Sequence, residues 1–224
     1  MNYFKAVLAI LKKDILMEIR TKETINATLV FSILITIVFS FISEPGSKTE
    51  QAVAGGIFWM AVTFSGILGL NKTMMSEIQG GNFEALMLAP IDRSAIFFGK
   101  VISNFLFLTI LEIILVPLFL VFYNVNLVSH WLMVVIILLA TYGYSVTGTL
   151  FSMISVRTKT REIMLPLLML PILVPVIIAA ILSTNIFLFN QEITYCYNWI
   201  KLMAVFDIIF TAVIFAIFSA VIEE

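Results

Sequence analysis

Six long apolar runs dominate the pattern of hydrophobic and polar positions along the chain. Each approaches or exceeds the roughly 20 mostly apolar residues with which an α-helix crosses the hydrocarbon core of a bilayer. The runs are continuous, whereas membrane β-strands alternate apolar and polar residues. The pattern therefore predicts an all-α integral membrane protein in which residues 1–224 form a single transmembrane domain. The six predicted spans are residues 25–42, 53–70, 101–123, 131–151, 163–183 and 202–222.

The composition agrees with a protein that is solvated mostly by lipid. Hydrophobic residues make up 61% of the chain and charged residues 12%, whereas soluble proteins carry about 25% charge. The formal net charge of −1 provides no basic field for nucleic acid. Cys196 is the single cysteine, so it cannot form an intrachain disulfide.

Lysine and arginine are distributed unevenly between the two sides that six spans would define. Eleven of them fall before the first span or in the second-to-third and fourth-to-fifth connections, and two, Lys48 and Lys201, fall on the other side. Because cytoplasmic segments carry the positive excess, we expect both termini in the cytoplasm. The eleven are Lys5, Lys12, Lys13, Arg20, Lys22, Lys72, Arg93, Lys100, Arg157, Lys159 and Arg161.

Residues 1–22 have the pattern of an amphipathic helix. An apolar stripe recurs at spacings of three and four residues, and the basic side chains fall mostly off it. Such a helix lies in the membrane interface. Two interpretations stay open: an anchor, or an element that moves during function. The stripe consists of Phe4, Leu8, Leu11, Ile15 and Ile19.

A polar insert separates the second and third runs. It predicts a short helix within residues 77–90, with a break at Gly80 and Gly81 and an end near Pro90, which disfavours helical geometry at the preceding residue. Asp92 or Ser94 would cap the next helix. We expect this hook to dock in a cytoplasmic ATPase; a stripe lying on lipid headgroups is the alternative. The candidate coupling residues are Glu77, Gly80, Gly81, Phe83, Glu84, Leu86, Met87, Pro90, Asp92 and Arg93.

No residue pattern in the chain predicts catalysis. The sequence lacks the GxxxxGK[ST] loop that holds nucleotide phosphates. It has one histidine and one cysteine, so no spaced metal-binding cluster is present. We therefore expect a non-catalytic membrane subunit without a bound metal, and ATP hydrolysis in a separate partner.

Two acids fall within predicted spans, Glu112 and Asp207. Intramembrane charges are costly and rarely face lipid. Each acid either lines a functional cavity or holds the helix bundle together, and the pattern favours the second interpretation. Three prolines in the fifth span, Pro166, Pro171 and Pro175, predict helix kinks.

His130 stands beside Trp131 at the predicted outer end of the fourth span. It would either ligate haem iron or serve as an ordinary interfacial residue, and the pattern favours the latter. In the fourth span, the pairs Gly143 with Thr147 and Gly148 with Ser152 allow close helix contact, which we expect within one subunit; contact across a dimer is the alternative.

Several stretches together resemble the membrane B subunits of the cytochrome c maturation haem exporters, a family of type-2 ABC exporters. The similarity extends over nearly the whole chain, and the order of the stretches is more specific than any one of them. Gln79, Gly80 and Gly81 depart from the family pattern, in which acidic residues are often found there. The stretches are KKDILMEIRTKETIN (12–26), GIFWMAVTFSGILGL (56–70), LNKTMMSEIQGGNFEALMLAPIDRSAIFFGKVISNFLF (70–107), GTLFSMISVRTKTREIMLPLLMLPILVPVIIAA (148–180) and VFDIIFTAVIFAIFSAVIEE (205–224).

The resemblance implies the type-2 ABC exporter fold and a place in a bacterial inner membrane. It implies an ATPase partner that supplies ATP hydrolysis, a second copy of this chain, haem-handling membrane subunits and a periplasmic haem chaperone. Haem would be a substrate and not a stably bound cofactor. The ATP-driven step would export haem or release a haem-loaded chaperone. A type-2 permease for a drug, lipid or polysaccharide, and a non-transporting membrane scaffold, are the alternatives.

Overall fold

The computed structural model describes residues 3–42, 48–125, 130–155, 158, 160–189 and 191–223. Within these ranges the chain is helical and contains no strand. The helices are α1 (Tyr3–Thr21), α2 (Glu23–Ile42), α3 (Lys48–Gln79), α4 (Asn82–Leu88), α5 (Arg93–Tyr123), α6 (Trp131–Ser155), α7 (Arg161–Leu188) and α8 (Cys196–Glu223), with a short 3-10 turn at Ile193–Tyr195.

Within the described residues, six helices are long and apolar enough to cross a membrane: α2, α3, α5, α6, α7 and α8. The predicted six-span, all-α fold is therefore confirmed. The helices extend beyond the predicted spans, most clearly where α3 continues to Gln79 and α5 begins at Arg93. Polar residues end an apolar run without ending a helix, because a helix satisfies its own backbone hydrogen bonds in water as in lipid.

Local backbone chemistry sets the breaks between helices. Lys22 has a φ of 52° and separates α1 from α2, and Gly81 has a φ of 65° and separates α3 from α4. A left-handed residue stops helix propagation, and glycine adopts this conformation without a Cβ penalty. Asp92 caps α5 by accepting a hydrogen bond from the Ser94 N–H at 2.9 Å, as the sequence predicted.

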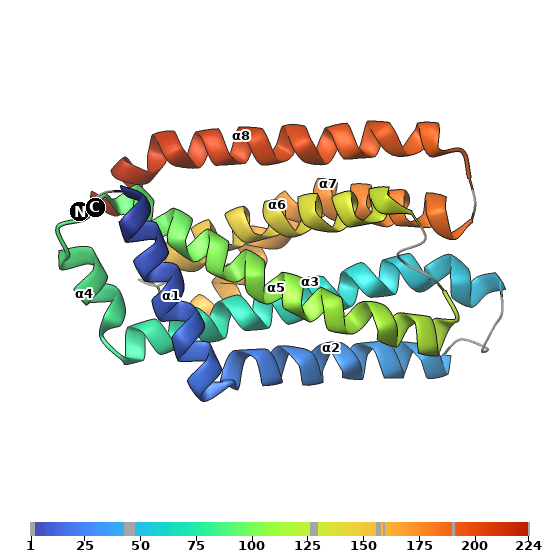
Figure 1. The fold of residues 1–224 in the computed structure, drawn as a ribbon, viewed down its shortest axis with the longest axis horizontal. Helices are drawn as coiled ribbons and strands as arrows, with labels where there is room; N and C mark the ends of the chain where they lie inside the picture. The colour runs from blue at the N-terminus through green and yellow to red at the C-terminus, as the bar shows by residue number, and fades with distance from the viewer. Residues whose placement is uncertain are drawn as a thin grey trace.

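The six long helices lie side by side, and α1 crosses them at one end (Figure 1). The short helix α4 lies at the same end, together with the start of α1 and the far end of α8 (Figure 1). We call this the α4 end. A chain that crosses a membrane six times has both ends on one side. The start of α1 and the far end of α8 lie at the same end of the bundle, in agreement with six spans. Helix α1 packs mainly on α5, which places it across the end of the bundle.

The helices differ in how much of their surface the bundle covers. In the apolar window of α3, 67% of residues are buried, against 17% in α2 and in the last span. Helix α3 is therefore central, whereas α2 and α8 present most of their apolar surface outward, as expected for helices that face lipid. Phe58 of α3 packs edge-on against Phe119 of α5, with ring centroids 5.3 Å apart, in the middle of the core.

Small residues allow α6 to contact its neighbours closely. A Cβ at Gly143 would clash with Asp207 of α8, and a Cβ at Gly148 would clash with Leu70 of α3. The prediction that these glycines pack within one subunit is confirmed. Pro166, Pro171 and Pro175 lie inside the continuous helix α7, and Pro117, which the sequence analysis did not weigh, lies inside α5. Whether the α7 prolines kink the helix stays a prediction.

Candidate functional site

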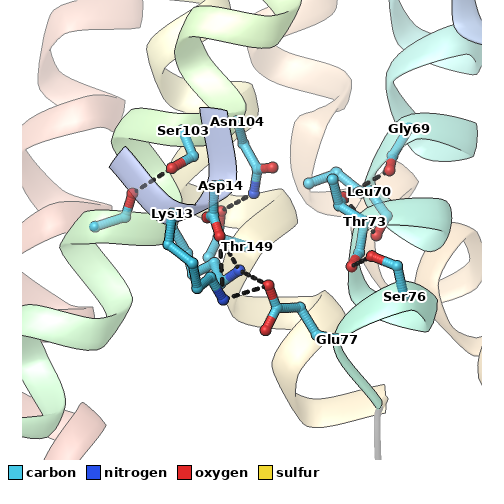
Figure 2. A network of polar contacts seen from close by, with 12 residues as sticks. Lys13, Asp14, Gly69, Leu70, Thr73, Ser76, Glu77, Ser103, Asn104 and Thr149 are labelled. Carbon is cyan, nitrogen blue, oxygen red and sulfur yellow. Dashed lines mark hydrogen bonds and ion pairs between the residues drawn. The ribbon is translucent and has the colours of Figure 1, made fainter. Parts of the chain in front are cut away.

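Four charged side chains from three helices meet at the α4 end. Lys100 of α5 donates to Asp14 of α1 at 2.9 Å and to Glu77 of α3 at 2.7 Å. Lys13 of α1 donates to the same Glu77 oxygen at 2.6 Å and pairs with Asp14 at 3.3 Å. Figure 2 shows Lys13, Asp14 and Glu77 converging from their separate helices. We call these four residues the ionic cluster.

Burial makes the ionic cluster energetically demanding. Asp14, Glu77 and Lys100 are buried, and only Lys13 reaches solvent, with 34% of its side chain exposed. Buried charges need nearby partners, because desolvation of an unpaired ion costs several kcal/mol. Burial lowers the pKa of Lys13, but the hydrogen bond to Glu77 and the charges of Asp14 and Glu77 outweigh it, so the pKa of Lys13 is raised above its ordinary value. The ionic cluster therefore holds α1, α3 and α5 together.

Hydrogen bonds extend this polar region towards α6. Asn104, one turn after Lys100 on α5, donates to the Thr149 hydroxyl of α6 at 2.9 Å. Ser103 donates to the Gly99 carbonyl of its own helix at 2.9 Å. Figure 2 places Asn104 and Ser103 beside the ionic cluster. Four helices are thus connected through polar side chains at the α4 end.

Glu77 corrects one boundary of the predicted coupling helix. The sequence pattern predicted Glu77 in a short helix within residues 77–90, whereas Glu77 belongs to the last turns of α3, before the break at Gly80 and Gly81. Its side chain is only 3% exposed. Two lysines draw it into the bundle, so the carboxylate is not available to a partner protein in this arrangement.

The short helix is observed as α4, and its orientation differs from the expectation. Phe83, Leu86 and Met87 are partly buried against a cluster that includes Ile10 of α1 and Met74 of α3. From the sequence we expected these three side chains to face a partner, but they pack on the bundle, because a hydrophobic surface of the same protein lies within their reach. Their contacts attach α4 to the bundle.

The outward face of α4 carries a different set of residues. Leu88 is 87% exposed, and Glu84, Ala85 and Pro90 are also exposed. A leucine this exposed at the end of a helix is available for contact with a partner or a membrane surface. Docking of α4 to an ATPase stays a prediction, and Leu88 is the exposed large apolar side chain on this face of α4.

Arg93 begins α5 directly after the α4 hook. Its side chain is partly buried, and its Nη1 atom is buried without a hydrogen-bond partner in the described part of the chain. Asp92, its neighbour, is exposed and is engaged as the cap of α5. The predicted role of both residues in coupling stays a prediction.

The two intramembrane acids are both buried, in different surroundings. Glu112 accepts a hydrogen bond from the Thr141 hydroxyl of α6 at 2.6 Å, which supports the interpretation that it connects helices. Asp207 lies against Gly143, and neither of its carboxyl oxygens has a hydrogen-bond partner among the described residues. Thr141 and Gly143 both belong to α6, so the two acids approach one central helix.

His130 has a structural role at the start of α6. Its Nδ1 accepts a hydrogen bond from the Leu132 N–H at 3.2 Å, and its ring stacks on Phe187 of α7 with centroids 5.4 Å apart. When Nδ1 accepts, the neutral ring carries its proton on Nε2, so Nε2 has no lone pair for a metal. Ligation of haem iron would require the hydrogen bond between His130 and Leu132 to break. The geometry therefore favours the interpretation of His130 as an interfacial residue.

The ionic cluster is not predicted by the sequence pattern. One signal was available: Asp14 and Glu18 are four residues apart on one face of α1, beside the apolar stripe, and this is the face that the bundle buries. Two acids on one buried helix face require cations or backbone donors from other elements. Their partners could not be identified from the sequence, because Glu77 and Lys100 are 63 and 86 positions from Asp14.

Comparison with known proteins places the whole chain in one family. The family model described as "CcmB protein" matches residues 5–223. "Heme exporter protein B" of Rhodobacter capsulatus is 26% identical over 170 residues, covering 76% of this chain and 78% of the relative. The proteins of the same name from Haemophilus influenzae and Pseudomonas aeruginosa are each 27% identical, over 175 and 177 residues, covering 77% and 79% of this chain and 78% of each relative. Because the family match spans nearly every residue, the chain belongs to the CcmB protein family.

Proposed function

We propose that this chain is the membrane-spanning permease subunit of an ABC complex that serves haem transport in cytochrome c biogenesis. The observation that carries the proposal is the family match over residues 5–223, joined to six spans with a short exposed helix at one end. The names of the relatives supply the cargo. The chain itself is a non-catalytic subunit of a bacterial inner membrane, with the α4 end in the cytoplasm.

The α4 end is the surface that receives an ATPase subunit. Eleven of the thirteen lysines and arginines are assigned to this side by the sequence, which supports its cytoplasmic location. Leu88 is the apolar anchor of the docking face, and exposed Glu84 tunes register and association rate. A soluble partner in contact with α4 would push on the segment that joins α3 to α5.

The ionic cluster makes that push act on several helices together. Helix α4 is connected to α3 through Gly80 and Gly81 and to α5 through the Asp92 cap. The ionic cluster ties the same two helices to α1. Displacement of α4 would therefore move α1, α3 and α5 as a unit, which assigns α1 a mechanical role in addition to anchoring.

Two copies of the chain assemble with two ATPase subunits in this proposal, since six spans supply half of a twelve-span ABC transporter. Haem-handling membrane subunits and a periplasmic haem chaperone complete the complex. The ATP-driven step exports haem or releases the haem-loaded chaperone. Haem acts as substrate, and ATP binds to the partner subunit.

Affinity purification of the chain from a mild detergent extract, followed by mass spectrometry, tests the proposal. It predicts recovery of an ATPase together with haem-handling membrane subunits. Recovery of an ATPase alone favours a type-2 permease for another cargo, such as a drug, a lipid or a polysaccharide. Recovery of neither supports the non-transporting scaffold and contradicts the proposal.

A further inference from the structure

A cavity of about 240 Å³ lies at the elbow between α1 and α2. Its walls come from the end of α1, the start of α2, the end of α3 and one face of α5. The volume is roughly twenty times what a single ordered water needs. We call it the elbow cavity. Its charged lining residues are Asp14, Glu18, Glu23, Lys72, Glu77 and Lys100.

The charges around the elbow cavity do not balance. Four carboxylates and two ammonium groups line it, and Lys13, which pairs with two of these carboxylates, leaves one negative charge in excess. The excess resides on Glu18. This side chain is 5% exposed, and no ion pair is formed by it within the described residues. Its Oε1 accepts a hydrogen bond from the Ile25 N–H, at 2.7 Å, at the start of α2.

Further acceptors belong to residues that line the same space. Glu77, a lining residue, has a second carboxylate oxygen that is buried without a hydrogen-bond partner in the described part of the chain. Thr73 and Ser76 also line the cavity and donate their hydroxyl protons to backbone carbonyls of α3 at 2.6 and 2.9 Å. Their oxygens therefore keep lone pairs for another donor. Figure 2 shows Thr73 and Ser76 on the turns beside Glu77. The elbow cavity is complementary to one positive charge that carries several N–H donors.

The arrangement suits an organic cation better than a metal ion. No group of three histidine, cysteine or acidic residues within the described ranges is close enough to hold a metal. The carboxylates are distributed over the walls instead. Lys72 lies at the exposed rim, where it pairs at 2.6 Å with Glu23, whose side chain is 70% exposed. An anionic group attached to a bound cation could therefore form an ion pair with Lys72 at the rim.

We propose that the elbow cavity binds a phosphoethanolamine group, with the primary ammonium at Glu18 and the phosphate at Lys72. The cavity lies at the end of the spans, where lipid headgroups begin, so a phospholipid carrying this headgroup is one source of the ligand. Free phosphoethanolamine is the other. Binding of either would occupy the junction between α1 and the spans and pair the ammonium with the Glu18 carboxylate.

The test uses the purified full-length chain in mild detergent and native mass spectrometry. Short-chain phosphatidylethanolamine is added, with phosphatidylcholine of equal chain length as the comparison, because a trimethylammonium has no N–H to donate. The wild type is expected to retain phosphatidylethanolamine selectively. Glu18→Gln keeps a carbonyl oxygen for the Ile25 N–H but removes the charge, so retention should fall about tenfold, as for loss of one charged hydrogen bond.

Two further variants make the result decisive. Glu84→Gln removes an acid from the exposed face of α4 and should leave retention unchanged. Lys72→Gln, at the exposed rim, should weaken retention without disturbing the buried core. Displacement of the lipid by free phosphoethanolamine supports a headgroup site that also accepts the soluble compound. Selective retention of phosphatidylethanolamine without such displacement supports the lipid as the ligand. Equal retention of phosphatidylcholine, or unchanged retention in Glu18→Gln, overturns the proposal.

Discussion

Replacement of Lys100 by methionine tests the ionic cluster. The substitution keeps an unbranched side chain of similar length but removes the ammonium that donates to Asp14 at 2.9 Å and Glu77 at 2.7 Å. Both acids are buried, so they would retain negative charge with fewer partners. A buried carboxylate that loses its cation is strongly destabilised.

The expected magnitude follows from the contacts that are lost. Each charged hydrogen bond is worth about 1.5–3 kcal/mol, so two give about 3–6 kcal/mol. Lys13 remains bonded to Glu77 at 2.6 Å, and the desolvation of Lys100 itself is relieved, which places the net loss near the lower end, at about 3 kcal/mol. For a chain of this size, about 2–4 °C of Tm corresponds to 1 kcal/mol, so Tm should fall by about 6–12 °C.

Thermal unfolding of the purified protein in mild detergent measures the effect, with Lys13→Met as the matched control. Because 34% of the Lys13 side chain is exposed, water replaces part of its interaction, and its loss should cost under about 1 kcal/mol. Adding Glu77→Gln to Lys100→Met should restore part of the stability, because Lys13 then balances the one buried carboxylate that remains, Asp14. Equal Tm shifts in the two lysine variants, or a further loss in the double variant, would refute the reasoning.

The remaining predictions concern topology, helix packing and assembly. In a background lacking Cys196, cysteines at positions 47 and 190, which lie outside the described residues, should react with an impermeant thiol reagent applied outside the cell. A cysteine at Gly81 should not react, and labelling at position 81 would show that the predicted orientation is wrong. Gly143→Ala should lower stability by about 1–3 kcal/mol because the new Cβ clashes with Asp207, and a combined Asp207→Ala should relieve the loss if that clash is the cause. Native mass spectrometry of the complex should show two copies of this chain beside two ATPase subunits, and a single copy would contradict the proposed assembly.

The span pattern could be predicted from the sequence because lipid imposes one strong rule, that long apolar runs cross as helices. The same rule says nothing about where a helix ends in water. Gln79 and Arg93 extend α3 and α5 beyond the apolar runs. The end of α3 depends on the backbone conformation of Gly81, and the start of α5 depends on the Asp92 cap. Both positions were predicted from the sequence, but the extra helical turns beyond the apolar runs were not.

The candidate site was less predictable than the spans. The sequence predicted that Phe83, Leu86 and Met87 would contact a partner protein, but an apolar stripe does not state whether a partner or the same chain covers it. The ionic cluster joins residues from α1, α3 and α5, and no local spacing encodes such a pairing. Both features depend on how α1 and α4 sit across the end of the bundle, which is a tertiary property.

Retention of the ATPase by α4 variants tests the central claim most directly. Each variant is purified by an affinity tag on this chain at matched expression, and the amount of co-purifying ATPase is measured. Leu88 is 87% exposed, so Leu88→Ala should leave Tm unchanged and weaken docking by about 2 kcal/mol, as for a typical interface anchor. Leu86→Ala, on the face of α4 that contacts the bundle, should lower stability instead. The account predicts that the Leu88→Ala variant loses the ATPase while its Tm stays at the wild-type value. Full retention of the ATPase, together with wild-type cytochrome c maturation, in that variant would contradict it.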